Sequence, residues 1–350
     1  MSTVLFVGGG TLGSLNPLIA VAQELRKRQP ELRSCFWTSY KALDQMVVRE
    51  AGFACAPIVS SKYRRYFSLR TLVDLGVFPL AFTIAFVRLA VRRPRVVASA
   101  GSYVAVPVSI AAWVLRIPVA LYQQDVELGL ANRIMSVFAT VRVAATPQRA
   151  KLFQRHAIAI GFALRQSVTK GDAAKARALY ALHASWPTLL VIGGSSGAQH
   201  LNELVVAGVH AWPAELNILH ITGEHKAPPT QREGYVQIPF TNDSLPDLYA
   251  VADIILCRAG SNVLAEVIGV GKAPIIIPLP GTQQEANALE LERAGAKVFY
   301  ESTLTPEILA GQVRAQLANT HYQTDVPRQL QKLWEVDGAP RFASIIQTYV

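Results

Sequence analysis

The sequence predicts an α/β protein made of two doubly wound domains, each a parallel sheet with helices on both faces. Three observations carry this prediction. Short apolar runs alternate with longer helical patterns up to residue 146, which is typical of parallel strands joined by helical crossovers. The alternation restarts near Gly161. Each half opens with an apolar strand that runs into a Gly-rich turn.

The first domain is expected to span residues 1–161. Its predicted strands cover residues 4–8, 34–39, 54–59, 96–100, 118–123 and 141–146. Its predicted helices cover residues 17–28, 44–52, 72–92 and 107–115. Residues 96–115 carry no charge and are long enough to cross a bilayer. Gly101, Ser102 and Pro107 interrupt them, so we interpret this stretch as strand, loop and helix.

The second domain is expected to span residues 162–338. Its predicted strands cover residues 188–194, 217–223, 235–240, 253–260 and 273–281, and a helix is predicted over residues 198–212. A last helix, at about 339–350, is expected to return to the first domain.

The composition is that of a well-packed globular protein, with 51% hydrophobic and 17% charged residues among 350. The three cysteines, Cys35, Cys55 and Cys257, lie far apart and form no CxxC pair. This spacing disfavours a disulfide framework or a zinc site and fits a reducing cytoplasm. The first residues lack the basic segment of a signal peptide.

The charge is distributed unequally. Residues 1–160 hold 20 Lys and Arg against 7 Asp and Glu, whereas residues 161–350 hold 14 against 17. Residues 62–95 alone hold eight basic residues and one acid, Asp74, interleaved with Tyr, Phe and Leu. This mixture predicts contact with an anionic membrane surface. A buried helix with a solvated basic end is the alternative. No nucleic-acid motif accompanies the basic residues, so no nucleic-acid partner is expected.

The first Gly-rich turn carries Gly8, Gly10 and Gly13 in the spacing of a dinucleotide fingerprint. That fingerprint also needs an acidic residue at the end of the second strand. Here the strand ends at Thr38 and Ser39, and Asp44 comes too late, which disfavours a nicotinamide or flavin enzyme. The turn still predicts an anion site, because glycines allow close approach to the amides of the following helix. Tight packing of strand on helix is the alternative.

The second turn, Gly193–Ala198, repeats the pattern and adds the hydroxyls of Ser195 and Ser196. With these turns, several motifs occur in the order found in one family. They are GGTLGSLNP (9–17), AGSYVAVP (100–107), YQQDVELGLANR (122–133), GFALR (161–165), GGSSGAQHLNE (193–203), HITG (220–223), FTNDSLPDLYAVAD (240–253), CRAGSNVLAE (257–266) and QQEANA (283–288). The chain therefore resembles the MurG family of GT-B glycosyltransferases over nearly its whole length.

The resemblance implies a fold of two Rossmann-like domains facing a cleft. It implies inverting transfer of N-acetylglucosamine from UDP-GlcNAc to lipid I, the undecaprenyl-diphospho-MurNAc-pentapeptide, to form lipid II for peptidoglycan. It places the protein peripherally at the cytoplasmic face of the cell membrane. It implies neither a cofactor nor a metal, and the sequence has no Asp-x-Asp pair to hold one.

The resemblance also assigns residues. On the donor side, Glu266 matches the carboxylate that holds the ribose hydroxyls, and Phe240 and Thr241 match the segment whose backbone reads uracil. The other donor residues implied are Arg165, Gly194, Ser195, Ser196, Gln283 and Gln284, the two glutamines at the sugar. The acceptor residues implied are Gly10, Thr11, Gly13, Asn16, Gly101, Tyr103, Gln124 and Asn132.

The chain departs from the family pattern where the catalytic base is expected. The family's first loop carries a histidine at the position of Ser14, and residues 1–155 contain no histidine. A serine hydroxyl is a poor base unless a neighbour activates it. In the motif HEQN, Gln123 replaces the glutamate and Asp125 the asparagine. We therefore hypothesise that Asp125 is the base or orients a water, with a turn-capping aspartate as the alternative.

Two other functions stay open at this stage. The loop before QQEANA is about two residues shorter than the family's and lacks its histidine, which leaves the sugar pocket uncertain. A GT-B transferase with another lipid acceptor or UDP-sugar is one alternative. A UDP-sugar-binding protein without turnover is the other.

Overall fold

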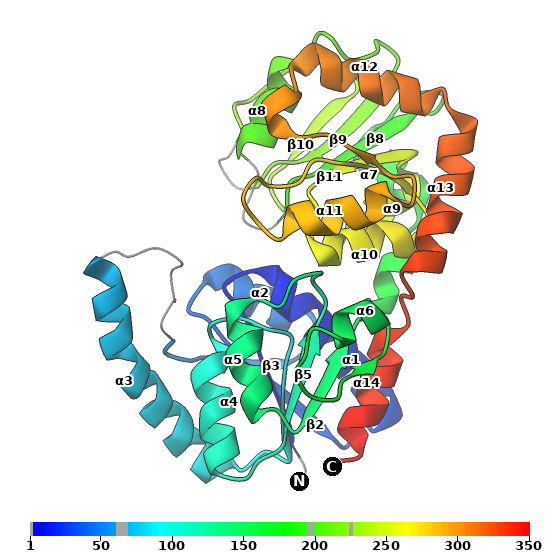
Figure 1. Cartoon of the computed structure of the whole chain (residues 1–350). Helices are drawn as coiled ribbons and strands as arrows, with labels where there is room; N and C mark the ends of the chain where they lie inside the picture. The colour runs from blue at the N-terminus through cyan, green and yellow to red at the C-terminus, as the bar shows by residue number, and fades with distance from the viewer. Residues whose placement is uncertain (1–2, 61–68, 195–198, 224–226) are drawn as a thin grey trace. The chain divides into compact units, whose positions relative to one another are not determined.

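The computed structural model describes residues 3–60, 69–194, 199–223 and 227–350, and only the backbone of residues 69–75. The chain divides into two compact units (Figure 1). Unit 1 consists of Met1–Arg165 and Glu335–Val350, and unit 2 of Gln166–Trp334. Each unit is an α/β body with its own parallel sheet, as the sequence predicts.

The sheet of unit 1 has seven parallel strands in the order β3-β2-β1-β4-β5-β6-β7. Its strands are β1 (Thr3–Val7), β2 (Arg33–Thr38), β3 (Ala54–Pro57), β4 (Val96–Ser99), β5 (Val119–Gln123), β6 (Val141–Ala144) and β7 (Ile158–Ala159). The interior strand β1 is apolar and buried from Val4 onward, as a strand covered on both faces should be.

Helices cover both faces of this sheet. They are α1 (Leu12–Arg28), α2 (Ala42–Glu50), α3 (Leu69–Arg92), α4 (Ala105–Val114), α5 (Leu130–Phe138), α6 (Pro147–Ala150) and α14 (Gly338–Gln347). Side chains of α3, α4 and α5 share one apolar core with the sheet, in which Leu89, Val108 and Met135 are fully buried. The chain's last helix, α14, lies beside α1 (Figure 1).

The sheet of unit 2 has six parallel strands in the order β10-β9-β8-β11-β12-β13. Its strands are β8 (Thr188–Ile192), β9 (Asn217–Ile221), β10 (Tyr235–Ile238), β11 (Ile254–Cys257), β12 (Ala273–Ile276) and β13 (Lys297–Val298). The two-residue strands β7 and β13 lie at sheet edges and are too short to give a periodic signal, so sequence reasoning missed them.

The helices of unit 2 also lie on two faces. They are α7 (Ala173–Leu179), α8 (Gln199–Ala207), α9 (Leu245–Val251), α10 (Ser261–Gly269), α11 (Gln284–Glu292), α12 (Pro306–Leu317) and α13 (Thr320–Leu333), with short 3-10 helices η1 (Gln166–Lys170) and η2 (Glu301–Thr303). Leu204 of α8 and Leu309 of α12 enter the same apolar core, and α9, α10 and α11 lie on the opposite face of the sheet (Figure 1).

Helix α1 begins at Leu12, five residues before the predicted start at Pro17, and therefore contains Ser14 and Asn16. Proline has no N–H to donate to the carbonyl four residues earlier. The Gln124 side chain supplies a donor instead, because its Nε2 lies 2.7 Å from the Gly13 carbonyl oxygen. A proline inside the first two turns is therefore accommodated by a side chain from the end of β5.

Helix α8 is shorter than the predicted helix over 198–212, because it ends at Ala207. At Gly208 a Cβ would lie 3.0 Å from the Pro306 Cβ, so the chain passes α12 where only glycine fits well. The following turn is anchored by Trp212, whose Nε1 donates to the Val205 carbonyl at 3.1 Å. Apolar residues after Gly208 therefore extend the helical pattern without extending the helix.

The chain leaves unit 1 and returns to it at one place. The Phe162 amide donates to the Glu335 carbonyl at 2.6 Å, and the Gly338 amide donates to the Phe162 carbonyl at 3.0 Å. From there α14 packs on α1, and the Phe342 ring lies 5.8 Å from the Tyr122 ring. The predicted return of the last helix to the first domain corresponds to this arrangement.

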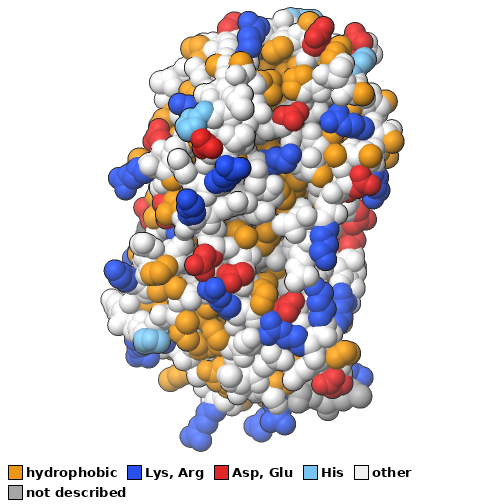
Figure 2. Space-filling model, turned by 90° about the vertical axis from the view of Figure 1, so that its right-hand side faces the viewer, with side chains coloured by type: hydrophobic (Ala, Val, Ile, Leu, Met, Phe, Trp, Pro, Cys, Tyr) orange, Lys and Arg blue, Asp and Glu red, His pale blue; other side chains and the backbone are white. Residues whose placement is uncertain are grey.

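The surface in Figure 2 mixes charges of both signs. Lys and Arg side chains are interspersed with Asp and Glu across this face, with hydrophobic side chains between them. On this face Lys and Arg side chains do not form a single large patch. Of the helices in the described part of the chain, none combines the length and hydropathy needed to cross a membrane.

Candidate active site

Each sheet has one point where the strand order reverses direction. In unit 1 it lies between β1 and β4, and in unit 2 between β8 and β11. Ligands of open α/β sheets bind outside the carboxyl ends of the strands at such a point. The Gly-rich turns after β1 and β8 occupy these positions, as do the segments after β4 and β11. The predicted residues of the turns after β1 and β8 therefore fall at the switch points, whereas Gln124, Phe240, Thr241, Gln283 and Gln284 follow other strands of the two sheets.

The turn after β1 is held by side chains that contact all four backbone polar groups of Gly9 and Gly10. The Gly9 amide donates to Ser14 Oγ at 2.9 Å, and the Gly9 carbonyl accepts from Ser102 Oγ at 2.7 Å. The Gly10 amide donates to Asp44 Oδ2 at 2.6 Å, and the Gly10 carbonyl accepts from Lys41 Nζ. This turn is therefore fixed from within the protein.

Both glycines are required by the backbone and by space. Gly9 has φ +138° and Gly10 has φ +86°, which are conformations that other residues rarely adopt. A Cβ at position 9 would lie 2.7 Å from Asp44 Oδ2, and one at position 10 would lie 2.6 Å from the Tyr103 ring. The glycines thus let the turn approach Asp44 and Tyr103 closely.

Two buried polar residues hold this turn, and the sequence motifs pointed to Ser14 but not to Asp44. Ser14, at the family's histidine position, is 7% exposed and uses its hydroxyl to hold the turn. Asp44, which follows the strand too late for the dinucleotide fingerprint, is 1% exposed and also accepts the Ser39 hydroxyl. Sequence reasoning missed its contact with Gly10, because the two residues are 34 positions apart.

Gln123 organises the loop that contains Asp125. Its Nε2 donates to the Asp125 carbonyl at 2.7 Å and to the Glu127 carbonyl at 2.8 Å, and its Oε1 accepts from Asn132 Nδ2 at 2.6 Å. A carboxylate could not donate these two bonds. The glutamine in place of the family's glutamate is therefore explained by the fold of this loop, and the Asp125 side chain stands partly exposed upon it.

The remaining acceptor-side residues lie around the same edge of the sheet. Gln124 is 7% exposed, and its carbonyl accepts from Arg149 Nε at 2.7 Å. Asn132 is 6% exposed and lies against Gly101, where a Cβ would be 3.1 Å from Asn132 Oδ1. Asn16 lies in α1 and is partly exposed. Thr11, the residue before α1, is exposed.

Glu266 lies in α10, the helix that follows β11. It is 4% exposed, and its Oε2 accepts the Tyr249 hydroxyl at 2.8 Å. Glu266 is therefore not a solvent-exposed carboxylate on the helix surface. A buried carboxylate at the carboxyl edge of a sheet is suited to accept hydrogen bonds from a diol.

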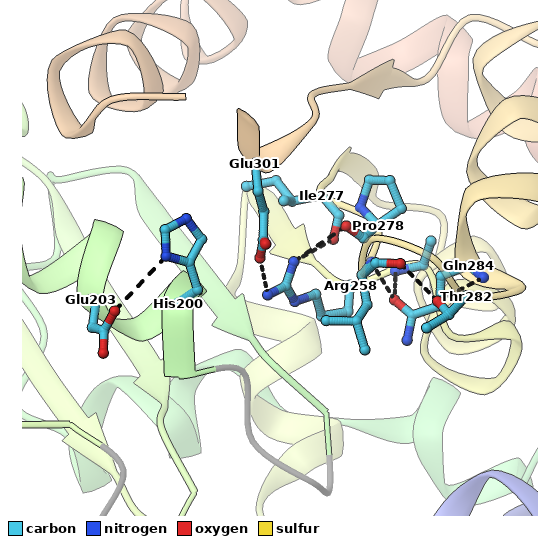
Figure 3. A network of polar contacts seen from close by, with 10 residues as sticks. His200, Glu203, Arg258, Ile277, Pro278, Thr282, Gln284 and Glu301 are labelled. Carbon is cyan, nitrogen blue, oxygen red and sulfur yellow. Dashed lines mark hydrogen bonds and ion pairs between the residues drawn. The ribbon is translucent and has the colours of Figure 1, made fainter. Parts of the chain in front are cut away.

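Arg258 and Gln284 tie together the loops at the ends of β11 and β12 (Figure 3). Arg258 is 4% exposed, pairs with Glu301 and donates to the Ile277 carbonyl at 3.2 Å. Gln284 Oε1 accepts the amides of Ala259 and Leu279, both at 3.1 Å. These contacts hold the shorter loop before QQEANA in place. Gln284 Oε1 already accepts two backbone amides.

The segment after β10 is closed by hydroxyls. Thr241 Oγ1 lies 2.6 Å from Ser244 Oγ, which in turn lies 2.9 Å from the Tyr180 hydroxyl. The Ser244 amide donates to Thr241 Oγ1 at 3.2 Å. The Thr241 side chain therefore fixes the loop, and Phe240 beside it is partly exposed.

A buried histidine stabilises the end of β9. His220 Nδ1 lies 2.7 Å from the Tyr235 hydroxyl, and its Nε2 lies 3.0 Å from Asn202 Oδ1. Burial lowers the pKa of His220 to about 4 and raises the pKa of Tyr235 to about 12. The ring is therefore neutral, and Asn202 carries the link onward to the Thr222 carbonyl at 2.7 Å.

The other predicted donor residues are placed as follows. Arg165 is 7% exposed and is the last residue of the first segment of unit 1. Gly194 has φ +92°, which requires glycine. Gln283 precedes α11 and is partly exposed. Ser195 and Ser196 lie outside the described residues.

Family models and relatives match nearly the whole chain. The glycosyltransferase family 28 N-terminal domain matches residues 4–144, and the family 28 C-terminal domain matches residues 188–341. A Bacillus cereus protein named UDP-N-acetylglucosamine–N-acetylmuramyl-(pentapeptide) pyrophosphoryl-undecaprenol N-acetylglucosamine transferase 2 is 31% identical over 317 residues, 88% of this chain and 90% of that protein. The Shouchella clausii transferase of that name is 32% identical over 90% of each chain.

Solved structures agree with these matches. The structure of Acinetobacter baumannii MurG has a TM-score of 0.72 and 25% identity, and the match covers 99% of this chain and 100% of that one. The Staphylococcus aureus MnaA–UDP structure, at 10% identity and a TM-score of 0.69, shares the fold. The fold is therefore GT-B, and the chain belongs to glycosyltransferase family 28, as its resemblance to the MurG transferases predicted.

Proposed function

We propose that this protein transfers N-acetylglucosamine from UDP-GlcNAc to undecaprenyl-pyrophosphoryl-MurNAc-pentapeptide, lipid I, and so forms lipid II for peptidoglycan. The match to transferases of that name over nearly nine-tenths of the chain carries the proposal. The sheet topology supports it, because the turns after β1 and β8 follow the strands between which the strand order reverses, where open α/β sheets bind ligands.

We assign the donor to unit 2. Glu266 accepts hydrogen bonds from the ribose hydroxyls, and the backbone of Phe240 and Thr241 reads uracil. Gly194, Ser195 and Ser196 contact the diphosphate from the turn after β8. Arg165, the one donor residue that belongs to unit 1, is proposed to add a cation. Gln283 and Gln284 contact the sugar hydroxyls, with Gln284 using Nε2 because its Oε1 is engaged with two backbone amides.

We assign the acceptor to unit 1. The contacts come from the turn after β1, the segment after β4 and the loop after β5. The residues are Gly10, Thr11, Gly13, Asn16, Gly101, Tyr103, Gln124 and Asn132. Asp125 stands partly exposed in the last of these segments and is the proposed base, whereas the Ser14 hydroxyl is already engaged by Gly9.

The proposed reaction is an inverting displacement. The acceptor hydroxyl attacks the anomeric carbon, its oxygen bonds to that carbon, and the bond from carbon to the diphosphate oxygen breaks. The hydroxyl proton passes to Asp125, directly or through a water, and UDP leaves with the electron pair. Negative charge grows on the diphosphate, where fixed donors stabilise the transition state.

Incubation with UDP-GlcNAc and lipid I tests the function. Formation of lipid II supports the proposal. Transfer only to another lipid acceptor or from another UDP-sugar would replace it with a different GT-B activity. Binding of UDP-GlcNAc without transfer to any acceptor would show a sugar-nucleotide-binding protein.

Substitution of Asp125 tests the base. Asp125→Asn keeps the shape of the side chain, and we expect turnover to fall at least about a hundredfold, within the range of general-base catalysis. Ser14→Ala is the comparison and should lower turnover less. If both variants retain turnover within a few-fold of the parent protein, the base lies elsewhere.

We further propose that unit 1 binds the cytoplasmic face of the membrane peripherally and binds no nucleic acid. Residues 62–68 lie outside the described residues, but the described part of α3 exposes Val91 at 81% and Leu80 at 55%. Trp113 of the neighbouring α4 is 56% exposed, and Arg93 is exposed at the end of α3. Exposed apolar side chains beside cations suit an anionic bilayer surface.

Vesicle flotation tests this surface. The protein should float with phosphatidylglycerol vesicles and much less with phosphatidylcholine vesicles. Val91→Ser with Trp113→Ser should weaken flotation, while Leu179→Ser, which changes an equally exposed residue (59%) in unit 2, should not. Equal flotation of all variants would contradict the assignment.

A further inference from the structure

The turn after β1 does not offer its first two amides to a ligand. The Gly9 amide donates to Ser14 and the Gly10 amide donates to Asp44, so both point at side chains of the protein. A Gly-rich turn that cradles an anion directs such amides at the anion instead. Here a buried carboxylate takes the place that the anion would have.

The Asp44 carboxylate also connects the turn to the segment after β4. Oδ2 accepts both the Gly10 amide and the Ser39 hydroxyl. Ser39 also interacts with the Tyr103 hydroxyl, and burial beside Asp44 raises the pKa of Tyr103, which keeps its phenol neutral. The Tyr103 ring in turn lies against Gly10. One carboxylate therefore fixes the turn and the tyrosine together.

Lys41 holds the same turn from an exposed position. Its Nζ donates to the Gly10 carbonyl. The amide and the carbonyl of Gly10 are therefore held by an anion and a cation that are only three residues apart in the chain. Asp44 is 1% exposed, which excludes it from touching a substrate, whereas Lys41 is exposed.

We propose that Asp44 is a positioning residue of the acceptor site, which, with Lys41, clamps the Gly10 peptide and thereby sets the turn and Tyr103 in the geometry that receives the acceptor. The inference rests on the proposed function, because the acceptor is lipid I. It implies that the acceptor's diphosphate is recognised without the Gly9 and Gly10 amides.

The test compares Asp44→Asn with Asp44→Glu, Lys41→Met and a control. Asp253→Asn is the control, because Asp253 Oδ2 also accepts a backbone amide, that of Thr188 at 2.7 Å, but at the amino end of β11 in unit 2. KM for lipid I, KM for UDP-GlcNAc, kcat and melting temperature are measured for each.

Asp44→Asn should raise KM for lipid I about tenfold or more and lower kcat, because small misplacements of contact groups are costly. KM for UDP-GlcNAc should change less than about twofold, and Asp44→Glu should restore part of the loss. Lys41→Met, at an exposed position, should raise KM for lipid I several-fold without loss of folding. Asp253→Asn should alter none of the kinetic constants.

Three results would overturn the inference. One is a lower melting temperature with unchanged kinetic constants for Asp44→Asn, which indicates a purely structural role. Another is a lower KM for lipid I, which indicates that Asp44 only repels the diphosphate. The third is an equal change in both KM values. If the parent protein forms no lipid II, the proposed function fails. Hydrogen exchange of residues 8–13 then tests whether Asp44 holds the turn. Exchange should accelerate in Asp44→Asn, and unchanged exchange would refute the inference.

Discussion

Single side chains in this protein are placed by what they can donate or accept. Gln123 and Gln124 donate from Nε2 to backbone carbonyls, which a carboxylate could not do, whereas Gln284 accepts two backbone amides through Oε1. These three glutamines thus shape the loops that carry the candidate site. Motif matching assigns Gln124 and Gln284 to the substrate, so it did not reveal that these side chains hold the backbone.

The first prediction concerns Gln123. Gln123→Glu places a carboxylate, at a position 2% exposed, against the carbonyls of Asp125 and Glu127. A buried carboxylate oxygen that faces a carbonyl oxygen with no proton between them destabilises the fold. The free energy of unfolding should therefore fall by about 2–3 kcal/mol. Urea unfolding measures it. Gln45→Glu, in which Arg49 still has an acceptor, is the control and should stay within about 0.5 kcal/mol of the parent.

The second prediction concerns Glu266. Tyr249→Phe removes the hydroxyl that orients Oε2, and KM for UDP-GlcNAc should rise about threefold to tenfold, the loss of one hydrogen bond to a charged group. KM for lipid I should not change. Glu266→Gln should raise KM for UDP-GlcNAc further. A smaller effect for Glu266→Gln than for Tyr249→Phe would remove Glu266 from the ribose site.

Sequence reasoning at this scale found Glu266 because a motif surrounds it. It did not find the role of Asp44, because the contact with Gly10 is made only when β2 pairs with β1 and brings residues 39–44 beside the turn. Nor did it foresee that Ser14 closes the turn. Contacts between distant residues depend on register, which a motif does not contain.

At the scale of elements, the buried strands were predictable and the helix ends were not. β1, β4, β5 and β8 are apolar except for one polar residue at an end of each, as two-faced burial in a parallel sheet requires. The start of α1 was placed too late because Pro17 suggested a first helical turn. The donor that accommodates Pro17 comes from Gln124, the residue after β5, more than a hundred residues away.

A double-mutant cycle tests this account of α1. Gln124→Ala removes the donor to the Gly13 carbonyl and should cost about 1–2 kcal/mol of unfolding free energy. In a Pro17→Ala background the residue 17 amide supplies a donor, so the same change should cost about 1 kcal/mol less. Urea unfolding of the four proteins gives the coupling. An equal cost in both backgrounds would contradict it.

The fourth prediction concerns α14. Phe342 is fully buried against Tyr122, so Phe342→Ala should destabilise unit 1 by about 3–5 kcal/mol. Arg341→Ala removes the ion pairs with Glu335 and Asp337, which are half exposed, and should cost less than about 1 kcal/mol. Hydrogen exchange of the β5 amides measures both. Similar effects of the two changes would show that α14 is held by its surface charges.

For the whole molecule, the alternation of apolar and helical patterns was enough to predict two α/β units, and the ordered motifs that resemble a known family indicated the class of reaction. They could not assign the base, because the family's histidine is absent and the neighbouring groups act through long-range contacts. The loop of unit 2 closed by Arg258 and Gln284 was likewise beyond prediction, since its length differs from the family's and its closure depends on Glu301.

The two units should respond differently to acid. The pKa of His220 falls from 6.5 to about 4 on folding, so the unfolded chain binds a proton first as the pH drops. Unit 2 therefore loses stability from about pH 6.5 to about pH 4, by about 3 kcal/mol from this group. His220→Gln, which can donate and accept without titrating, should flatten that slope. Hydrogen exchange of β9 at about pH 7 and about pH 4.5 measures it, and an unchanged slope in the variant would assign the effect to other groups.

The return of the chain at Phe162 and Glu335 also has a consequence for synthesis on the ribosome. Unit 2 is one uninterrupted segment and can fold as soon as it has emerged. Unit 1 must wait, with all seven strands made, until α14 follows and packs beside α1. The first unit to be translated is thus the last to be completed, and during that interval the apolar surface around Tyr122, which α14 covers, is the part of the nascent chain that a chaperone would have to shield.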